Sequence, residues 1–491
     1  MNLRAMICGL CVAPLAAAAL ATTITVNSLT DGPNADDGVC TLREAIASSN
    51  ANADVNAGFA ACRDAVGYGA DLIRFSVGGT LTISTTLPSF TDTAETRVLG
   101  DLDADGDPDV SVSGGGTAVP FVVDPGARAR LDRLSIGNGH SGLGGGGILN
   151  FGTLHLDACT VSGNTADGDG AGVLNSAQAT LVVQFGVFVG NTAGHDGGAI
   201  ATEGGNVSVF GTELSSNHAR SGGAMYALAP ANVSLQNSWL LGNTATLSGG
   251  AVWSATSLFL SGSTLSGNAT DGDGGGVFEE NGDLRAANST ISGNSALHGG
   301  GLAMAAGTGD LENVTLAANG ASVDGGAIFT ADGVDLTLSN TLVAQSSGAA
   351  NCGGGTIIDG TANLDDGTSC GFGGGSLTSA TPGLGPLADH GGSTPTHALL
   401  TGSDAIDAGL AATCASVAVG GVDQRGNLRP VDGDGDGTAR CDIGAFEAGS
   451  LPVVAVPTLG QGMLTSLAIL LGILALGRLR RHARGRTPTP P

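Results

Sequence analysis

The sequence predicts an all-β chain built around a right-handed parallel β-helix of about nine coils, with about 26 residues per coil and capped ends. Three observations lead to this fold. Gly accounts for 85 of the 491 residues, an Asn recurs at intervals of 25–27 residues, and short runs alternate apolar with small polar residues. Alternating runs indicate strands, and a repeat of 20–50 residues is typical of a solenoid. Connections between parallel strands are right-handed as a rule.

Residues 1–21 are predicted to be a cleaved secretory signal peptide. Arg4 precedes an apolar stretch, and Ala19-Leu20-Ala21 supplies the small residues of a cleavage site. A membrane anchor is the alternative, but the stretch is short and rich in Ala. The mature chain is therefore expected outside the cytoplasm, where disulfides form.

Residues 22–130 are predicted to form an N-terminal cap and the first coils. Thr41 and Glu44 have the spacing of a capping box, which predicts a short helix starting near Thr41. The segment 40–46 breaks the β pattern and resembles the CSLREA domain, which opens many secreted bacterial repeat proteins. A cap is needed here because the end of a β-helix exposes unpaired strand edges.

Residues 131–350 are predicted to contain the regular coils, each with three short strands. The recurrent Asn is expected at one corner of every coil, where its amide can bond to the Asn of the next coil. Glycine in phase with it permits positive φ at the corners. A β-propeller or a leucine-rich solenoid is the alternative, but blades need about 40 residues and leucine-rich repeats space Leu differently. The predicted ladder consists of Asn138, Asn164, Asn191, Asn217, Asn243, Asn268, Asn294 and Asn319, with Gln345 continuing it.

Residues 351–450 are predicted to form a C-terminal cap. The segments 405–409, 423–426 and 441–447 resemble parts of the choice-of-anchor Q domain. This resemblance and the CSLREA resemblance occur at opposite ends of the chain in a consistent order. Together they imply a secreted bacterial β-helix protein.

Residues 451–491 are predicted to be a sorting signal. The motif Val456-Pro457-Thr458-Leu459 precedes an apolar run just long enough to span a membrane, and five Arg follow it. Such an Arg cluster stays in the cytoplasm. The layout resembles the IPTL-CTERM signal, although Gly462-Met463 stands where that family has Trp-Gly. It implies an exosortase-type enzyme as partner and transient anchoring in the inner membrane by a transmembrane helix. A permanent membrane anchor is the alternative.

Seven Cys remain once the signal peptide is removed. The simplest pairing is local, although spacing alone leaves other connectivities open. Cys159 lies inside the repeats at an apolar position and is expected to be a buried free thiol. The predicted disulfides are Cys40–Cys62, Cys352–Cys370 and Cys414–Cys441.

Two Asp-rich runs predict Ca²⁺ as the one cofactor. Both alternate carboxylates and place a Gly after the third, which resembles the first half of a calcium loop. The twelfth position of the first run is Val112 rather than a bidentate Glu. A solvated acidic turn is the alternative for each. The predicted ligands are Asp101, Asp103, Asp105, Asp107, Asp109, Asp432, Asp434 and Asp436.

The charge distribution excludes nucleic acid as a partner. All 18 basic residues are Arg, and six of them lie in the two terminal signals. The body between the signals holds the other 12 and all 44 acidic residues, which gives it a net charge of −32. Binding to nucleic acid requires a basic surface that displaces counterions from phosphates.

Enzymatic function is the serious alternative to a binding role. A lyase acting on acidic polysaccharides needs a basic side chain, and the segment 138–345 contains two, Arg220 and Arg285. Hydrolysis needs two carboxyls about 5–9 Å apart. Glu203 and Glu279-Glu280 share a coil position but lie three coils apart, about 14 Å at the usual spacing. No catalytic residue is therefore predicted.

The predicted function is that of an exported structural or adhesin-like protein on the surface of a Gram-negative bacterium. Repeats of the type Gly-Gly-Ala-Ile and Phe-x-x-Asn also resemble those of chlamydial polymorphic outer-membrane proteins, which are β-helical adhesins. Repeated Asn, Ser and Thr on the flanks would bind an extracellular glycan or protein. The alternative is a β-helical polysaccharide lyase or glycoside hydrolase.

Overall fold

The computed structural model describes residues 22–450 except 33–37, 52–61 and 63–68. The predicted signal peptide and the sorting motif Val456–Leu459 with its apolar run lie outside the described residues. In the part of the chain that is described, no helix is long and apolar enough to cross a membrane.

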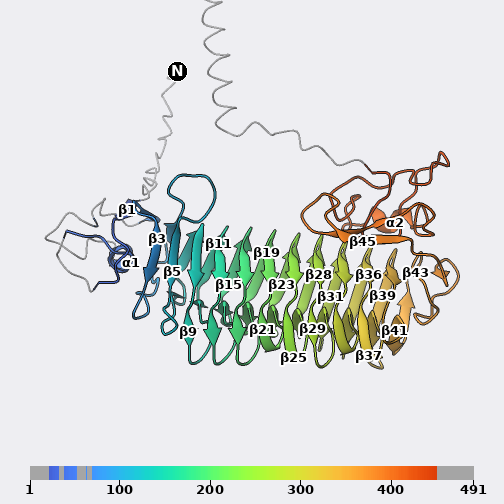
Figure 1. Cartoon of the computed structure of the whole chain (residues 1–491), viewed down its shortest axis with the longest axis horizontal. Helices are drawn as coiled ribbons and strands as arrows, with labels where there is room; N and C mark the ends of the chain where they lie inside the picture. The colour runs from blue at the N-terminus through green and yellow to red at the C-terminus, as the bar shows by residue number, and fades with distance from the viewer. Residues whose placement is uncertain (1–21, 33–37, 52–61, 63–68, 451–491) are drawn as a thin grey trace, which may run out of the picture. The chain divides into compact units, whose positions relative to one another are not determined.

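The chain forms a parallel β-solenoid of about 11 turns (Figure 1). Four sheets run along it, two of 13 strands and the others of 10 and 8 strands. The two 13-stranded sheets are sheet A, from β1 (Thr22–Val26) to β42 (Ile357–Asp359), and sheet B, from β3 (Gly79–Thr82) to β44 (Leu377–Thr378). The 10-stranded sheet C extends from β6 (Phe121–Val123) to β41 (Cys352–Gly354). The 8-stranded sheet D extends from β9 (His140–Ser141) to β37 (Gly320–Asp324).

Each central coil has four strands where the sequence predicts three. One such coil comprises β14 (Val173–Asn175), β15 (Thr180–Gln184), β16 (Val187–Val189) and β17 (Thr192–Ala193). The additional strand belongs to sheet D and follows the recurrent Asn. With only two to five residues, it is too short to show an alternating pattern. The solenoid also exceeds the predicted nine coils because coils before residue 138 and after 345 lack the Asn and Gly signature.

The interior is filled by aliphatic side chains that stack on one another from coil to coil. In sheet A, parallel pairing without offset places one aliphatic residue of each strand above the equivalent residue of the next strand. All of them are at most 2% exposed, and burying each contributes about 1.5–3 kcal/mol. One such stack is Leu154, Leu181, Val207, Val233, Leu258 and Leu284.

Seven of the eight predicted ladder Asn form a continuous row of hydrogen bonds. In the first six, the side-chain Nδ2 donates to the Oδ1 of the next Asn at 2.9–3.0 Å, and the row ends at Asn319. Each Nδ2 also donates to a backbone carbonyl, and every member is at most 1% exposed. The members are Asn164, Asn191, Asn217, Asn243, Asn268, Asn294 and Asn319.

Asn138 does not belong to the ladder, and that prediction is wrong. It aligns with the corner residue Gly163, has φ of +49°, and is exposed. The ladder position in its coil is Gly139, whose N–H donates to the Oδ1 of Asn164 at 2.8 Å. Gln345 is displaced in the same way, with φ of +58°. Both follow their aliphatic residue by two positions instead of three, so they fall on the left-handed corner.

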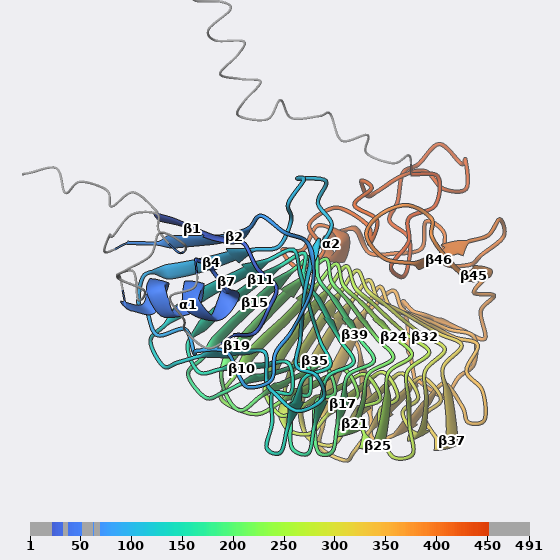
Figure 2. The ribbon, with the colours of Figure 1, turned by 60° about the vertical axis from the view of Figure 1, so that its left-hand side comes forward.

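The predicted helix and disulfides are present. Helix α1 (Leu42–Ala51) begins with a capping box, in which the Thr41 N–H donates to Oε2 of Glu44 at 2.9 Å and the Glu44 N–H donates to Thr41 Oγ1 at 3.3 Å. The helix packs against β1 and β2 (Asp71–Phe75) at the N-terminal end of sheet A (Figure 2). The disulfides Cys40–Cys62, Cys352–Cys370 and Cys414–Cys441 all form, and Cys159 is a buried free thiol.

Residues 379–450, the C-terminal flank, lie along the outer face of sheet B (Figure 1). The side chain of Gln424 accepts a hydrogen bond from Thr290 Oγ1 at 2.6 Å and donates to Thr264 Oγ1 at 2.8 Å. Further along, the Ala445 N–H donates to Thr315 Oγ1 at 2.9 Å. The segment predicted as a cap thus has two parts, since residues 351–378 complete the last coils and the flank covers the side of the solenoid.

Three corner Asn that the sequence analysis does not single out hold the C-terminal flank. Asn288, Asn313 and Asn340 occupy the left-handed corner between sheets A and B, with φ of +45° to +52°. Their Nδ2 groups donate to backbone carbonyls of the flank at 3.0–3.3 Å. Earlier coils carry Arg, Ala, Phe, Gly and once Asn (Asn237) at this corner, whereas Asn288, Asn313 and Asn340 occupy it in three consecutive coils under the flank.

Candidate functional site

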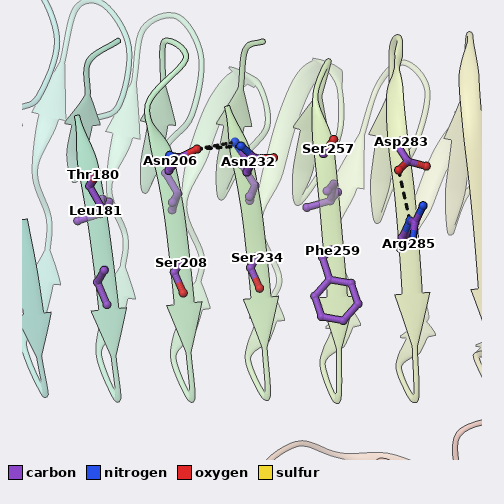
Figure 3. A pocket seen from close by; sticks show the side chains of 14 residues that line it. Thr180, Leu181, Asn206, Ser208, Asn232, Ser234, Ser257, Phe259, Asp283 and Arg285 are labelled. Carbon is purple, nitrogen blue, oxygen red and sulfur yellow. Dashed lines mark hydrogen bonds and ion pairs between the residues drawn. The ribbon is translucent and has the colours of Figure 1, made fainter. Parts of the chain in front are cut away.

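A groove of about 400 Å³ crosses the outer face of sheet A (Figure 3). It extends over β15, β19 (Asn206–Phe210), β23 (Asn232–Gln236), β27 (Ser257–Ser261) and β31 (Gly282–Ala287). Alternation along each strand sends the core residues inward and two rows of side chains outward. The first row is Thr180, Asn206, Asn232, Ser257 and Asp283, and the second is Val182, Ser208, Ser234, Phe259 and Arg285.

The lining of the groove is mainly apolar, with amides and hydroxyls placed along its two outward rows. Oδ1 of Asn206 accepts hydrogen bonds from both the backbone N–H and Nδ2 of Asn232, each at 3.1 Å. The one acidic and the one basic residue of the lining form an ion pair, with Arg285 Nε 3.3 Å from Asp283 Oδ2. Phe259 supplies the aromatic surface. The groove can therefore donate and accept hydrogen bonds beside an apolar patch, and it carries no net charge.

A second cavity of about 590 Å³ continues from the C-terminal end of the groove and shares Phe259 and Arg285 with it. The C-terminal flank contributes Ser416–Ala418 to its lining. Ser416 Oγ donates to Glu312 Oε2 at 2.5 Å, which ties the flank to β35 (Gly307–Glu312). The side chain of Val417 is fully exposed at this wall. Groove and cavity together run from β15 to β35.

An acidic pocket of about 470 Å³ lies in the turns around sheet D. Asp169 and Glu203 both line it, together with Asp167, His195 and the apolar side chain of Leu143. Burial, and then the charge of Asp169, raise the pKa of the Glu203 carboxyl. From the sequence alone, Glu203 lacks a near partner and Asp169 is not a predicted site residue. The structure instead brings Asp169 and Glu203 into one pocket.

Glu279 is not a surface carboxylate. It points into the solenoid, in register between Ser254 and Met304 on the neighbouring strands, and is 0% exposed. The polar groups near its carboxylate are the Ser254 side chain and the backbone N–H groups of Asn281 and Gly282. Burial raises the pKa of Glu279 to about 8. It cannot act on a ligand at the surface.

The first Asp-rich run forms a loop with three clustered carboxylates. Oxygens of Asp101, Asp103 and Asp109 lie within 4.8 Å of one another, whereas Asp105 and Asp107 are not in this group. The two Asp101 oxygens accept the N–H groups of the residues three and five positions on, at 2.6 and 3.2 Å. The run is thus folded as a compact loop in which three of the five predicted ligands converge.

The second run has the same loop geometry but gains a ligand from elsewhere in the chain. The Asp432 oxygens again accept the N–H groups three and five positions on, at 2.8 and 2.9 Å. Its carboxylate clusters with those of Asp434 and Asp407 within 4.8 Å. Asp436 lies outside this group, 3.5 Å from the guanidinium of Arg440. Asp407 is buried, and its Oδ2 accepts the N–H of Asp434 at 2.9 Å.

Both loops fit the donor set of Ca²⁺. This ion takes six to eight oxygens at about 2.3–2.6 Å, so its ligands lie within about 5 Å of one another. Each loop offers three carboxylates in that range. The first loop also has a cationic neighbour, since Nε of Arg133 lies 3.5 Å from Oδ2 of Asp101. The second loop has one as well, because the guanidinium of Arg440 lies 3.5 Å from Oδ2 of Asp436.

Comparisons with known proteins show no family for this chain. No family model matches it, and no curated protein matches it. Among solved structures it is similar to pectate lyase Pel9A, with 14% identity and a TM-score of 0.40 over 87% of this chain and 97% of that chain. This similarity is too low to support an inference about the present chain.

Proposed function

We propose that this protein is an exported, non-catalytic surface scaffold that binds a glycan in the groove of sheet A. The observation that carries the proposal is the groove itself. It combines regularly spaced amides and hydroxyls with the aromatic ring of Phe259. Binding sites for small polar ligands have this composition, an apolar surface with a few placed polar groups.

The charge of the molecule supports a non-catalytic role toward acidic polymers. With a net charge of −32, the body repels polyanions, and the groove has a single basic side chain that is already paired. Cleavage of an acidic polysaccharide by elimination requires a base together with stabilisation of the developing negative charge. The groove lacks a second basic group among its lining residues.

The route to the surface and the role of Ca²⁺ belong to the same proposal. Residues 1–21 direct export, and the IPTL-CTERM-like segment is processed by an exosortase-type enzyme at the inner membrane of a Gram-negative bacterium. Ca²⁺ binds the Asp101 and Asp432 loops and rigidifies them. The second loop belongs to the C-terminal flank, so the ion strengthens the segment that lines the second cavity beside the groove.

Binding to an immobilised glycan array tests the proposed function. The mature body, residues 22–450, should bind at least one class of glycan, and the double variant N206A/N232A should weaken that binding about tenfold or more, because it removes two side-chain amides. The matched control is N138A, an exposed Asn on a corner outside the groove. Equal binding by N206A/N232A and the native protein would place the site elsewhere.

A glycoside hydrolase is the second candidate, and the acidic pocket favours it. Retaining and inverting hydrolases need one carboxyl with a raised pKa and a second carboxylate near it. The pKa of Glu203 is raised, and Asp169 supplies the second carboxylate in the same pocket. Reducing-sugar release from a polysaccharide panel tests this candidate. Turnover that disappears in both E203Q and D169N, with binding retained, would replace the binding proposal with a catalytic one.

A further inference from the structure

We infer that the ligand of the sheet A groove is a neutral polysaccharide in an extended conformation, lying parallel to the solenoid axis with one sugar stacked on Phe259. This inference rests on the proposed function and specifies its ligand class. It is built from the direction of the groove, the period of its polar groups, its apolar surface and its charge.

The groove runs across the strands and therefore along the solenoid axis (Figure 3). It spans five neighbouring strands of sheet A, which at the usual spacing gives a length of about 19 Å. A hexopyranose in an extended chain covers roughly the distance between two neighbouring strands, so about four sugars fit. A linear polymer suits this shape.

Polar groups recur in the groove with the period of the coil. Thr180, Asn206, Asn232 and Ser257 follow one another along the first row, and Ser208 and Ser234 are neighbours in the second. Each coil thus offers similar donors and acceptors at the same height. A polymer of identical sugars presents its hydroxyls with a matching period, whereas a globular protein surface does not.

Phe259 interrupts the second row with the only aromatic side chain of the groove lining. It is half-buried, and it also lines the adjoining cavity, so the ring is accessible from two sides. Aromatic residues are scarce in this protein at 3% of the chain. The apolar face of a pyranose ring packs against an aromatic ring, which places one sugar unit here.

The charges in the groove favour an uncharged sugar. Asp283 is compensated by Arg285 at 3.3 Å and by the hydroxyl of Thr308 at 3.0 Å. An ionic sugar would gain no unpaired partner among the lining residues, and the body of charge −32 repels acidic ones. A neutral sugar pays no such electrostatic penalty.

An extended peptide is a poorer occupant of this surface. Peptides that bind to sheets pair with the backbone of an edge strand. The strands under the groove are interior strands of sheet A, whose backbone groups already pair with the coils on both sides. The groove presents side chains only, and these suit the hydroxyl groups of a sugar chain.

Calorimetric titration of the mature body with defined oligosaccharides tests the inference. Neutral cello- and xylo-oligosaccharides of two to six units should bind with an affinity that rises up to about four units and then levels off. F259A and the groove-filling S234W should each weaken binding about tenfold or more. The matched control is F185A, which removes an exposed Phe outside the groove lining.

The salt dependence of binding and titrations with charged oligosaccharides distinguish a neutral ligand from a charged one. Affinity for the neutral oligomers should stay constant between about 0.01 and 1 M salt, where the Debye length falls from about 30 to 3 Å. Oligogalacturonides and chitosan oligomers should not bind at the groove. Binding of one of these that is lost in F259A would overturn the neutral ligand but leave glycan binding in place. If no glycan binds at millimolar concentration, both the inference and the proposed function fail.

Discussion

The side chain of a ladder Asn satisfies several backbone and side-chain groups at once. Oδ1 of Asn243 accepts from the backbone N–H and Nδ2 of Asn217, both at 3.0 Å. Its Nδ2 donates to the Leu214 carbonyl at 2.8 Å and to Asn268 Oδ1 at 2.9 Å. All these groups are buried, so their bonds are made in a medium of low dielectric constant. The ladder therefore specifies the register of the coils as well as stabilising them.

Removing one ladder Asn should be costly. N243A removes four buried hydrogen bonds and leaves the backbone N–H of Asn217 without its acceptor, and we expect the free energy of unfolding to fall by at least about 3 kcal/mol. Denaturant unfolding followed by circular dichroism measures it. N138G is the control, because Asn138 is exposed and has a φ that Gly adopts freely, and it should change stability by less than about 0.5 kcal/mol. Equal losses in both variants would contradict the ladder.

Glu279 should make stability depend on pH. Burial, and more weakly the charge of Asp283, raise its pKa from an ordinary 4.5 to about 8 in the folded chain. Between these values the folded chain holds a proton that the unfolded chain has lost, so the free energy of unfolding falls as the pH rises from about 4.5 to about 8.

The variant E279Q tests this dependence. It should match the native protein near pH 4.5 and exceed it above pH 8, by on the order of 5 kcal/mol at most, since one pKa unit corresponds to about 1.4 kcal/mol. Thermal unfolding at a series of pH values measures the difference. E280Q, at the exposed neighbouring residue, is the control and should follow the native curve. Parallel curves for E279Q and the native protein would rule out titration of Glu279.

Sequence reasoning succeeds at residues whose role follows from local spacing. The ladder Asn lie three positions after an aliphatic residue or, in one coil, Phe188, and the capping box joins Thr41 to Glu44 three residues on. Asn138 and Gln345 were assigned wrongly because a period of about 26 residues does not resolve a shift of one position. Glu279 was misplaced because an acidic residue in the interior contradicts the usual preference for the surface.

At the level of elements, the two Asp loops share one hydrogen-bonding scheme but differ in their surroundings. The first lies near Arg133, and the second recruits the buried Asp407. The sequence indicates both loops, since the ligand spacing is local. It does not indicate Asp407, which is 25 positions before Asp432 and reaches the loop through the fold of the C-terminal flank. The sequence also does not indicate that Asp169 and Glu203 line one pocket, because they belong to different coils and meet only through the fold.

Calcium should stabilise the C-terminal flank. At a concentration 100 times the dissociation constant, a single site raises the free energy of unfolding by about 2.7 kcal/mol, and chelation should reverse the gain. Thermal unfolding in Ca²⁺ and in chelator measures it, and D434N should lose the contribution of the second loop while keeping that of the Asp101 loop. D335N, at an exposed Asp outside both loops, is the control. An unchanged midpoint in millimolar Ca²⁺ would exclude binding at both loops.

At the scale of the whole molecule, the period of the Asn and Gly predicts the solenoid and its 26-residue turn. The sequence cannot show that the flank turns back along sheet B, because the contacts of Gln424 join residues about 130–160 positions apart. The sequence does not indicate the groove either, because its outward side chains come from every second residue of five strands and form no motif. Both features result from stacking, which brings together positions separated by whole coils.

Hydroxyl-radical footprinting with a bound glycan tests the central claim most directly. The method reports the solvent accessibility of Phe and Leu side chains, and Phe259 in the groove and Leu143 in the acidic pocket serve as the two probes. We expect a glycan that binds the mature body to protect Phe259 in the sheet A groove and to leave the exposed Leu143 of the acidic pocket unchanged. Protection of Leu143 with Phe259 unchanged would contradict binding in the groove and move the site to Asp169 and Glu203.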